Sequence, residues 1–186
     1  MIKLISIVLF FSFRVFAQSP SGITLGFIPS GDRDVLKKGS LLIAKQLQEE
    51  ISIPVNIYVS KDYSSMIQAM KQGKVDFAFL SAATFVAAEQ ELKIQVLLKK
   101  IWAEPFYYSA LLTKKNSKIK KIEDLKGKKI AFVDLKSTSG YLYPQVMFKK
   151  MGWDDKKFSE IRFSGSHSES VKLLESNQVD VIAVFT

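Results

Sequence analysis

The sequence alternates short apolar runs of strand length with longer segments of helical periodicity, and this alternation restricts the fold more than any other feature. Apolar residues that recur every three or four positions indicate helices, whereas short β-branched and aromatic runs indicate strands. Because strands that alternate with helices pair in parallel through crossover connections, the chain is predicted to be an α/β protein. In the first half we predict strands at residues 23–28, 55–59, 75–80 and 94–101, and helices at residues 35–50, 64–72 and 82–91.

The same alternation returns after a basic, polar stretch at residues 114–121. Most aromatic side chains on such strands are expected to be buried, because they carry the largest apolar surface. On this ground we assign Phe77, Phe79, Phe132 and Phe163 to the core. The elements predicted in this half are strands at residues 107–113, 129–133, 161–163 and 179–184, and helices at residues 122–125, 141–151 and 168–176.

Two segments of the chain resemble each other at an offset of 104 residues. Residues 62–80 and 166–184 both run from a hydroxyl-rich helix start into a Val-Asp pair and an apolar strand. We therefore predict two lobes of one topology, with the first lobe at residues 18–105, and the crossover and second lobe at residues 106–186. The aspartates are predicted to support backbone or helix-end hydrogen bonds where the strands begin. The matched pairs include Tyr63 with His167, Ser64 with Ser168, and Asp76 with Asp180.

The N-terminus has the features of a cleaved secretory signal at residues 1–17. A short basic start precedes an apolar run at residues 4–13, which is too short to span a bilayer, and small residues precede Gln18. The mature chain is therefore expected to begin at Gln18. Because the sequence has no cysteine to carry a lipid anchor, we expect a free protein of an enclosed compartment, the periplasm.

The formal charge of +9 becomes +7 when Lys3 and Arg14 leave with the signal, since two of 27 basic residues are lost against 18 acidic ones. The lysines are scattered and lack the aromatic residues that single-strand binding requires, so we predict no nucleic-acid partner. A basic surface also attracts small anions. With no cysteine and one histidine, a disulfide scaffold and a multi-residue thiolate or imidazole metal centre are excluded, and no cofactor is predicted.

Hydroxyl-rich loops follow five of the predicted strands. In open α/β sheets, ligands bind outside the carboxyl ends of the strands, where loops lead into helices. Hydroxyl groups, free backbone N–H groups and the helix dipole at such places suit a phosphate-like oxyanion, although serine and threonine are also simple helix caps. Tyr63 lies in a polar loop at a strand end, where its hydroxyl can reach a ligand, and we expect at least one of Tyr107 and Tyr108 to face the cleft. The loops lie at residues 29–32, 60–63, 81–84, 137–140 and 164–167.

An enzymatic alternative has to be considered, since Ser139, His167 and Asp180 include the three residue types of a serine hydrolase triad. However, no GxSxG elbow is present, and Ser139 lies in a hydroxyl cluster typical of a helix cap. Neither the GxxxxGK[ST] nor the GxGxxG nucleotide motif occurs. A binding protein without enzymatic activity is therefore the favoured interpretation.

The loops and their flanking strands resemble a known family. The segments GFIPSGD, DYSSMIQAMKQGKVDFAFLSAATFV, EDLKGKKIAF, STSGY and FSGSH together are similar to the substrate-binding proteins of phosphate, phosphite and phosphonate ABC transporters. The resemblance covers about residues 22–186. It implies the type II periplasmic-binding-protein fold, in which two α/β lobes enclose the ligand in a cleft between them.

The resemblance also implies the ligand-binding residues. By this likeness Ser137, Thr138, Ser139 and His167 hold the phosphonate oxygens, and Tyr63 closes on them from the other lobe. Ser81 follows the third strand and is added as a candidate, as is Tyr108 from the crossover segment.

The expected function is that of a periplasmic solute-binding component of an ABC importer. The protein would capture phosphonate, phosphite or phosphate between its lobes as a monomer and deliver it to the membrane permease. A sensor or scavenger for such an anion is the alternative among binding proteins. Members of the family run to nearly 300 residues, and the final strand at residues 179–184 has no polar tail, so we expect the C-terminal part of the fold to be missing.

Overall fold

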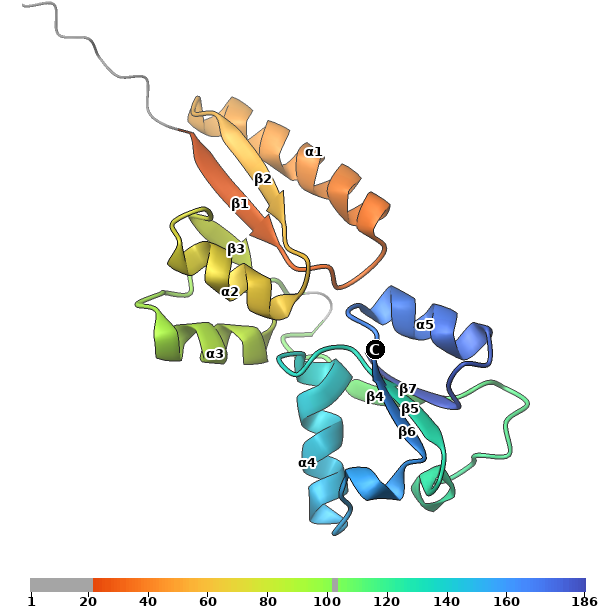
Figure 1. Ribbon diagram of the computed structural model, residues 1–186. Coiled ribbons are helices and arrows are strands. Elements are labelled where there is room, and N and C mark those ends of the chain that lie inside the picture. The colour runs from red at the N-terminus through yellow and green to blue at the C-terminus, as the bar shows by residue number, and fades with distance from the viewer. Residues whose placement is uncertain (1–21, 102–103) are drawn as a thin grey trace, which may run out of the picture.

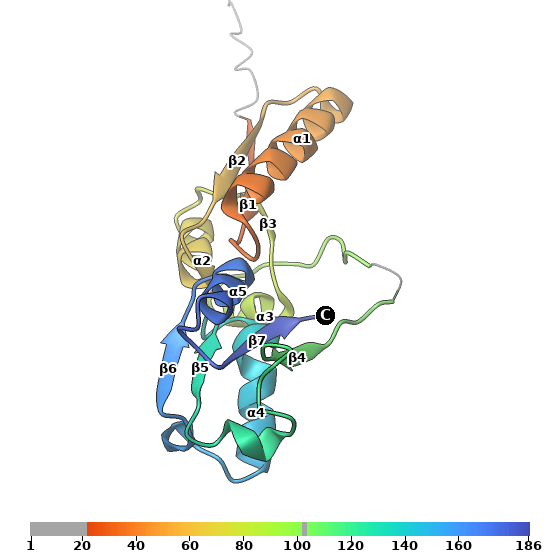
Figure 2. The same cartoon turned by 90° about the vertical axis from the view of Figure 1, so that its right-hand side faces the viewer.

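The protein contains two separate β-sheets, each flanked by helices. Each sheet with its helices forms one lobe, and the two lobes lie end to end (Figures 1 and 2). The computed structural model describes residues 22–101 and 104–186, so the predicted signal at residues 1–17 lies outside the described residues. Within the described ranges, none of the helices combines the length and the apolar character needed to cross a bilayer.

The first lobe is built on a parallel three-stranded sheet with the order β2-β1-β3. In Figure 1, α1 covers one face of this sheet, and α2 and α3 lie on the opposite side. Its elements are β1 (Ile23–Phe27), α1 (Arg33–Ile51), β2 (Val55–Val59), α2 (Tyr63–Lys71), β3 (Phe77–Phe79) and α3 (Ala82–Glu91).

The second lobe is built on a four-stranded sheet with the order β4-β7-β5-β6. Strand β4 pairs antiparallel with β7, whereas β5, β6 and β7 are parallel. Helices α4 and α5 lie on opposite sides of this sheet (Figure 1). Its elements are β4 (Ser109–Leu112), η1 (Ile122–Leu125), β5 (Lys129–Phe132), η2 (Thr138–Leu142), α4 (Tyr143–Lys150), η3 (Asp155–Lys157), β6 (Glu160–Phe163), α5 (His167–Glu175) and β7 (Val181–Phe185).

The internal repeat predicted from the sequence is confirmed by the topology. The order β6-β5-β7 in the second lobe reproduces the order β2-β1-β3 in the first. The two aspartates of the repeat also make the same contact: Asp76 Oδ2 accepts a hydrogen bond from the Thr24 amide, and Asp180 Oδ2 accepts one from the Lys129 amide, both at 2.8 Å. Each carboxylate therefore ties the start of one strand to its neighbour, as predicted.

The lobes are in contact. One apolar cluster combines Val133, at the end of β5, with Ile28, Tyr63 and Met66 of the first lobe. The backbone amide of His167 at the start of α5 also donates a hydrogen bond of 3.2 Å to the Ser30 carbonyl. The structure is therefore a closed arrangement of the two lobes.

The strand predicted at residues 94–101 is wrong. These residues have no regular secondary structure, and the chain from the end of α3 to residue 101 runs along the outside of the molecule (Figure 2). Leu97 and Leu98 are 66% and 92% exposed. An apolar run becomes a strand only where another strand pairs with it, and no described strand lies beside this segment.

Three of the four phenylalanines assigned to the core are partly exposed. Phe132 is fully buried, but Phe77, Phe79 and Phe163 are 41%, 50% and 51% exposed. Phe77 and Phe79 are exposed because they lie on β3, an edge strand of the first sheet. Helix α1 packs mainly against β2 and β1 and leaves β3 uncovered on that side. Phe163 likewise ends the edge strand β6 of the second sheet.

Candidate functional site

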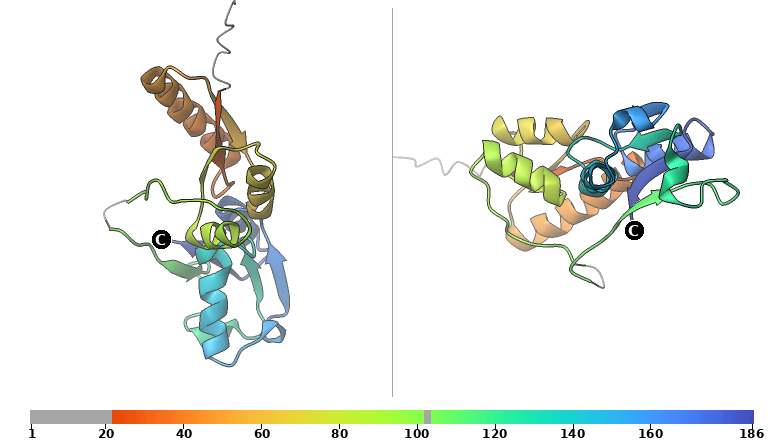
Figure 3. Two further views of the ribbon diagram at one scale, coloured as in Figure 1. Left: turned by 90° about the vertical axis from the view of Figure 1, so that its left-hand side faces the viewer. Right: turned by 90° about the horizontal axis from the view of Figure 1, so that it is seen from below.

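Helix starts from both lobes meet at the junction of the two sheets. Helices α2 and α3 of the first lobe, and η2 and α5 of the second, all begin in loops that follow the carboxyl ends of strands. Figure 3 presents α2, α3 and the start of α4 at this junction from two further directions. Because the first N–H groups of a helix have no partner within the helix, this junction concentrates hydrogen-bond donors and the positive ends of helix dipoles.

The loop before η2 is the most constrained of these starts. Ser137 caps the helix, and its Oγ accepts a hydrogen bond of 3.1 Å from the Gly140 amide. The following turn is wide, because the Leu142 amide donates to the Ser137 carbonyl five residues earlier. A Cβ at Gly140 would lie 2.5 Å from Val133 Cγ2, so only glycine fits there. The sequence STSG therefore folds into one compact turn against the end of β5.

Several donors of this turn have no acceptor among the described residues. Ser137, Thr138 and Ser139 are 1%, 7% and 3% exposed, so water reaches them poorly. The amides of Thr138 and Ser139 precede the first hydrogen bond within η2, and neither amide donates to another described group. The Thr138 hydroxyl accepts from the Ala83 amide at 2.9 Å but donates to nothing described. The turn thus presents unused donors inside the protein, as an oxyanion site requires.

Tyr63 faces this turn from the first lobe. Its side chain is 2% exposed, and its phenol lies within hydrogen-bonding reach of the Ser137 side chain. Burial raises the pKa of Tyr63 to about 12, with smaller contributions from the Asp134 carboxylate and the phenol of Tyr107. Tyr63 is therefore a neutral hydroxyl at neutral pH and is able to donate a hydrogen bond across the cleft.

His167 begins α5, the counterpart of the position that Tyr63 has in α2. It is 8% exposed, and its ring packs edge-on against Phe185 with the centroids 4.8 Å apart. Its Nδ1 is buried and has no hydrogen-bond partner among the residues that the structure describes. Burial lowers the pKa of His167 to about 4, so the imidazole is neutral in this closed arrangement. Buried polar atoms of folded proteins are nearly always hydrogen-bonded, so this nitrogen is available to a ligand.

Ser81 and Tyr108, the other two site residues predicted from the sequence, lie outside the η2 turn. Ser81 caps α3, where its Oγ accepts from the Thr84 amide at 3.3 Å and lies 3.4 Å from the Lys136 carbonyl of the other lobe. Tyr108 is 62% exposed, and its ring packs against Phe106. The structure brings Tyr107, rather than Tyr108, close enough to Tyr63 to influence its pKa.

The sequence did not distinguish these two tyrosines because neighbouring residues of an extended chain point to opposite sides. The choice depends on the pairing of the crossover segment. Here the Tyr108 backbone pairs with Thr186 at the end of β7, which fixes the register. Tyr107 is therefore identified by the tertiary structure and not by the local sequence.

A hydrolase triad is not assembled. The Asp180 carboxylate bonds the Lys129 amide at the beginning of β5, whereas His167 follows the far end of the neighbouring strand β6. Nδ1 of His167, the atom that a triad aspartate would orient, has no partner. In residues 22–101 and 104–186, moreover, no group of three or more His, Asp or Glu side chains is arranged to hold a metal ion.

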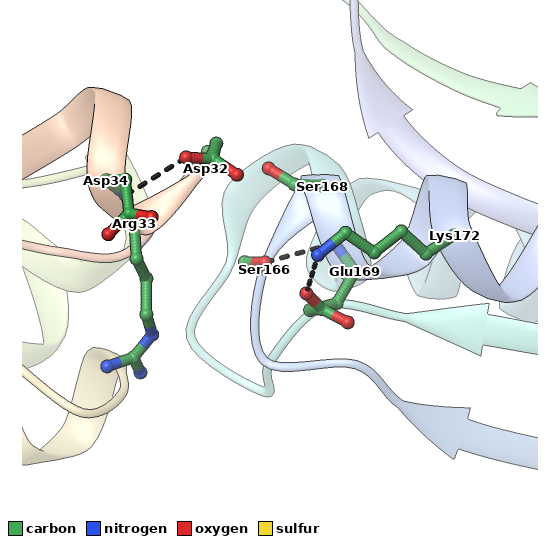
Figure 4. A pocket seen from close by; sticks show the side chains of 8 residues that line it. Asp32, Arg33, Asp34, Ser166, Ser168, Glu169 and Lys172 are labelled. Carbon is green, nitrogen blue, oxygen red and sulfur yellow. Dashed lines mark hydrogen bonds and ion pairs between the residues drawn. The ribbon is translucent and has the colours of Figure 1, made fainter.

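Two open cavities of the closed structure lie beside the η2 turn rather than on it. One, of about 210 Å³, separates the starts of α1 and α5 (Figure 4), where Asp32 and Asp34 lie opposite Ser168 and Lys172. Lys172 Nζ is held by Glu169 at 2.7 Å. Residues 137–139 are buried and line neither this cavity nor the second, of about 280 Å³ beside Asp134.

Two α/β lobes of one topology, with helix starts converging on a buried cluster of unused donors between them, define the type II periplasmic-binding-protein fold. The family described as the periplasmic substrate-binding protein of phosphonate ABC transporters matches residues 25–186. The chain belongs to this family, and the resemblance noted in the sequence is confirmed.

Relatives and solved structures agree with this assignment. The probable ABC transporter phosphite-binding protein PhnD1 of Prochlorococcus marinus is 25% identical over 94% of this chain and 61% of its own. The phosphate-import protein PhnD of Mycolicibacterium smegmatis is 32% identical over 67% of this chain and 40% of its own. The chain therefore spans less than two thirds of the length of these relatives.

Among solved structures, the binding protein of a phosphonate ABC transporter from Pseudomonas aeruginosa superposes with a TM-score of 0.80 at 28% identity. It covers 88% of this chain, which in turn covers 57% of it. PhnD1 from Prochlorococcus marinus, solved in complex with methylphosphonate, has a TM-score of 0.81 at 24% identity, covering 89% of this chain and 64% of its own. The two-lobed fold predicted from the sequence is thus confirmed.

Proposed function

We propose that this protein is the periplasmic solute-binding component of an ABC importer and that it captures a phosphonate-like oxyanion between its lobes. The observation that carries the proposal is the buried turn of Ser137, Thr138 and Ser139, whose amides and hydroxyls include donors without acceptors. Unpaired buried donors destabilise a protein, so their retention is explained if a ligand accepts their hydrogen bonds.

The chemistry of the donors supports an oxyanion with several oxygens. The η2 turn supplies hydroxyl and amide groups, Tyr63 supplies a neutral phenol from the other lobe, and His167 supplies an imidazole nitrogen that has no partner. Phosphonate, phosphite and phosphate each offer at least three oxygens that accept hydrogen bonds. Hydrogen bonds to a charged group are the stronger kind, about 1.5–3 kcal/mol each.

The remaining site candidates have separate roles in the proposal. Of the two tyrosines in the crossover segment, Tyr107 lies near Tyr63 and is assigned to the cleft. Tyr108 is exposed, so it would act on the ligand only from outside the closed cleft. Ser81 would act on the site indirectly, through its contact with the Lys136 carbonyl of the other lobe.

The family to which the chain belongs supports a role of this protein in transport. A cleaved signal at residues 1–17 would release a monomer into the periplasm, with the first lobe at residues 18–105, and the crossover and second lobe at residues 106–186. Closure of the lobes around the anion would produce the conformation that a membrane permease recognises. The net positive charge favours encounter with an anion.

Calorimetric titration of the full-length gene product with methylphosphonate, phosphite and phosphate tests the proposal. Loss of one hydrogen bond to the anion should weaken binding by one to two orders of magnitude. We expect this loss in both Thr138→Ala and His167→Ala, and no change in the matched control Thr113→Ala, which removes a hydroxyl just beyond β4.

Two outcomes would overturn the proposal. Unchanged affinity in both Thr138→Ala and His167→Ala would place the oxyanion site elsewhere. Turnover of an ester that Ser139→Ala abolishes would favour the hydrolase. A preference for phosphate over methylphosphonate would keep the site but shift its use toward phosphate import or sensing.

A further inference from the structure

The loop that leads into η2 is docked across the lobes onto the start of α3. The Lys136 carbonyl accepts a hydrogen bond of 3.1 Å from Thr84 Oγ1, and two residues later Thr138 Oγ1 accepts one of 2.9 Å from the Ala83 amide. The two bonds bracket Ser137, which caps the oxyanion turn. The geometry of this turn is therefore set in part by the opposite lobe.

Thr84 is well placed for such a role because its environment is dry. The residue is fully buried, at 0% exposure, and its Oγ1 lies 2.7 Å from Ser81 Oγ. Each hydroxyl has a single proton. The shorter contact to the Lys136 carbonyl belongs to Thr84, at 3.1 Å against 3.4 Å, so Thr84 donates to that carbonyl and Ser81 donates to Thr84.

The helix itself does not need the Thr84 hydroxyl. Ser81 already caps α3 by accepting from the Thr84 amide, and the Thr84 side chain is not part of that cap. Its hydroxyl instead contacts a loop 52 residues away in the sequence. A buried hydroxyl destabilises a protein unless it forms a hydrogen bond. The bond to the Lys136 carbonyl therefore explains why a polar side chain is tolerated at this buried position.

The second bond acts on the Thr138 hydroxyl. Because Thr138 Oγ1 accepts from the Ala83 amide, the hydroxyl proton is directed away from α3 and is left available for another acceptor. A hydroxyl that accepts one hydrogen bond is also polarised into a better donor for the next. The start of α3 thereby prepares Thr138 without touching the ligand.

We infer that Thr84 is a positioning residue of the oxyanion site, which holds the Lys136 carbonyl so that the Ala83 amide can orient the Thr138 hydroxyl toward a bound phosphonate-like anion. This inference rests on the proposed function, since it concerns how that site is arranged. It also makes the start of α3 a part of the site that contributes no ligand contact of its own.

The test uses calorimetric titration of the full-length gene product with methylphosphonate. Thr84→Val keeps the shape of the side chain but removes the hydroxyl, and we expect about tenfold weaker binding. Thr84→Ser restores the hydroxyl and should restore most of the affinity. In a double-mutant cycle, Thr84→Val should add little to Thr138→Ala, because both substitutions remove the same prepared donor.

A matched control separates positioning from general destabilisation. Ser40 is 2% exposed, and its Oγ bonds the Lys37 carbonyl within α1 at 2.9 Å, so Ser40→Ala also removes a buried side-chain-to-backbone hydrogen bond. Both variants should lower the melting temperature, but Ser40→Ala should leave the affinity unchanged. If Thr84→Val does not fold, Thr84→Ala removes the same hydroxyl in a smaller side chain and is held to the same expectation.

The outcomes distinguish this inference from the proposed function. Wild-type protein that does not bind any of the three oxyanions overturns both. Wild-type protein that binds methylphosphonate, with Thr84→Val and Thr84→Ala equally tight, overturns the positioning role alone. Full additivity of Thr84→Val and Thr138→Ala would also overturn it, because Thr84 would then act independently of the oxyanion turn.

Discussion

Acidification should act on the closed protein through His167, the single histidine of the sequence. Burial lowers the pKa of His167 from an ordinary value of 6.5 to about 4 in the closed arrangement. An unfolded chain therefore binds more protons than the closed protein between these two values. The stabilisation that comes from keeping the imidazole neutral is present above pH 6.5 and is lost as the pH falls from 6.5 toward 4.

The size of this effect follows from the two pKa values. Each pKa unit corresponds to about 1.4 kcal/mol, so the full difference of 6.5 − 4 = 2.5 units corresponds to about 3–4 kcal/mol. About 2 kcal/mol of this should be lost between pH 7 and pH 5. Because the ring is 8% exposed and has no carboxylate bonded to Nδ1, no described partner offsets the penalty.

Urea denaturation of the wild type and of His167→Gln at pH 7 and pH 5 measures the effect, since glutamine does not titrate in this range. The wild type should lose about 2 kcal/mol more than the variant, and proton NMR should give the imidazole a pKa well below 6.5. An imidazole that titrates near 6.5, or an equal loss of stability in both proteins, would refute the reasoning.

Three further predictions follow from named contacts. Gly140→Ala should destabilise the protein by about 1–3 kcal/mol in thermal or urea unfolding, because the added Cβ would lie 2.5 Å from Val133 Cγ2, and full retention of stability would contradict this. Asp180→Ala should lower the unfolding free energy by about 1 kcal/mol through loss of its bond to the Lys129 amide, without changing methylphosphonate affinity; a loss of binding would revive a functional role for this carboxylate. Tyr63→Phe should speed methylphosphonate dissociation in stopped-flow measurements while leaving association nearly unchanged, since the phenol belongs to the lobe that closes; a purely slower association would argue against that role.

Much of the fold was predictable because it depends on local periodicity. Helices α1, α2, α3 and α5 and most strands lie within a few residues of the predicted ranges. The repeat was predictable for the same reason, since Asp76 and Asp180 mark the starts of equivalent strands. Local patterns of this kind are encoded in neighbouring residues and do not require knowledge of the partner strand.

The errors occur where a partner decides the outcome. Residues 94–101 have the composition of a strand but no described strand beside them, and Phe77 and Phe79 are exposed because β3 lies at a sheet edge. The composition of a segment shows how much apolar surface it carries. It does not show whether another strand or helix packs against that surface.

In the site, the sequence and its family resemblance indicated the turn at Ser137 and His167. They did not single out Thr84 within the loop at residues 81–84, and they did not choose Tyr107 over Tyr108. The contact of Thr84 with the Lys136 carbonyl joins two lobes across 52 residues of sequence. Such a contact depends on how the lobes meet, which no local pattern records.

The most direct test of the central claim is a crystal structure of the full-length gene product with methylphosphonate. We expect the phosphonate oxygens to accept hydrogen bonds from the Thr138 and Ser139 hydroxyls and amides at the start of η2, and His167 and Tyr63 to supply the remaining hydrogen bonds. Methylphosphonate bound instead between the starts of α1 and α5, beside Asp32 and Lys172, or outside the cleft altogether, would contradict it.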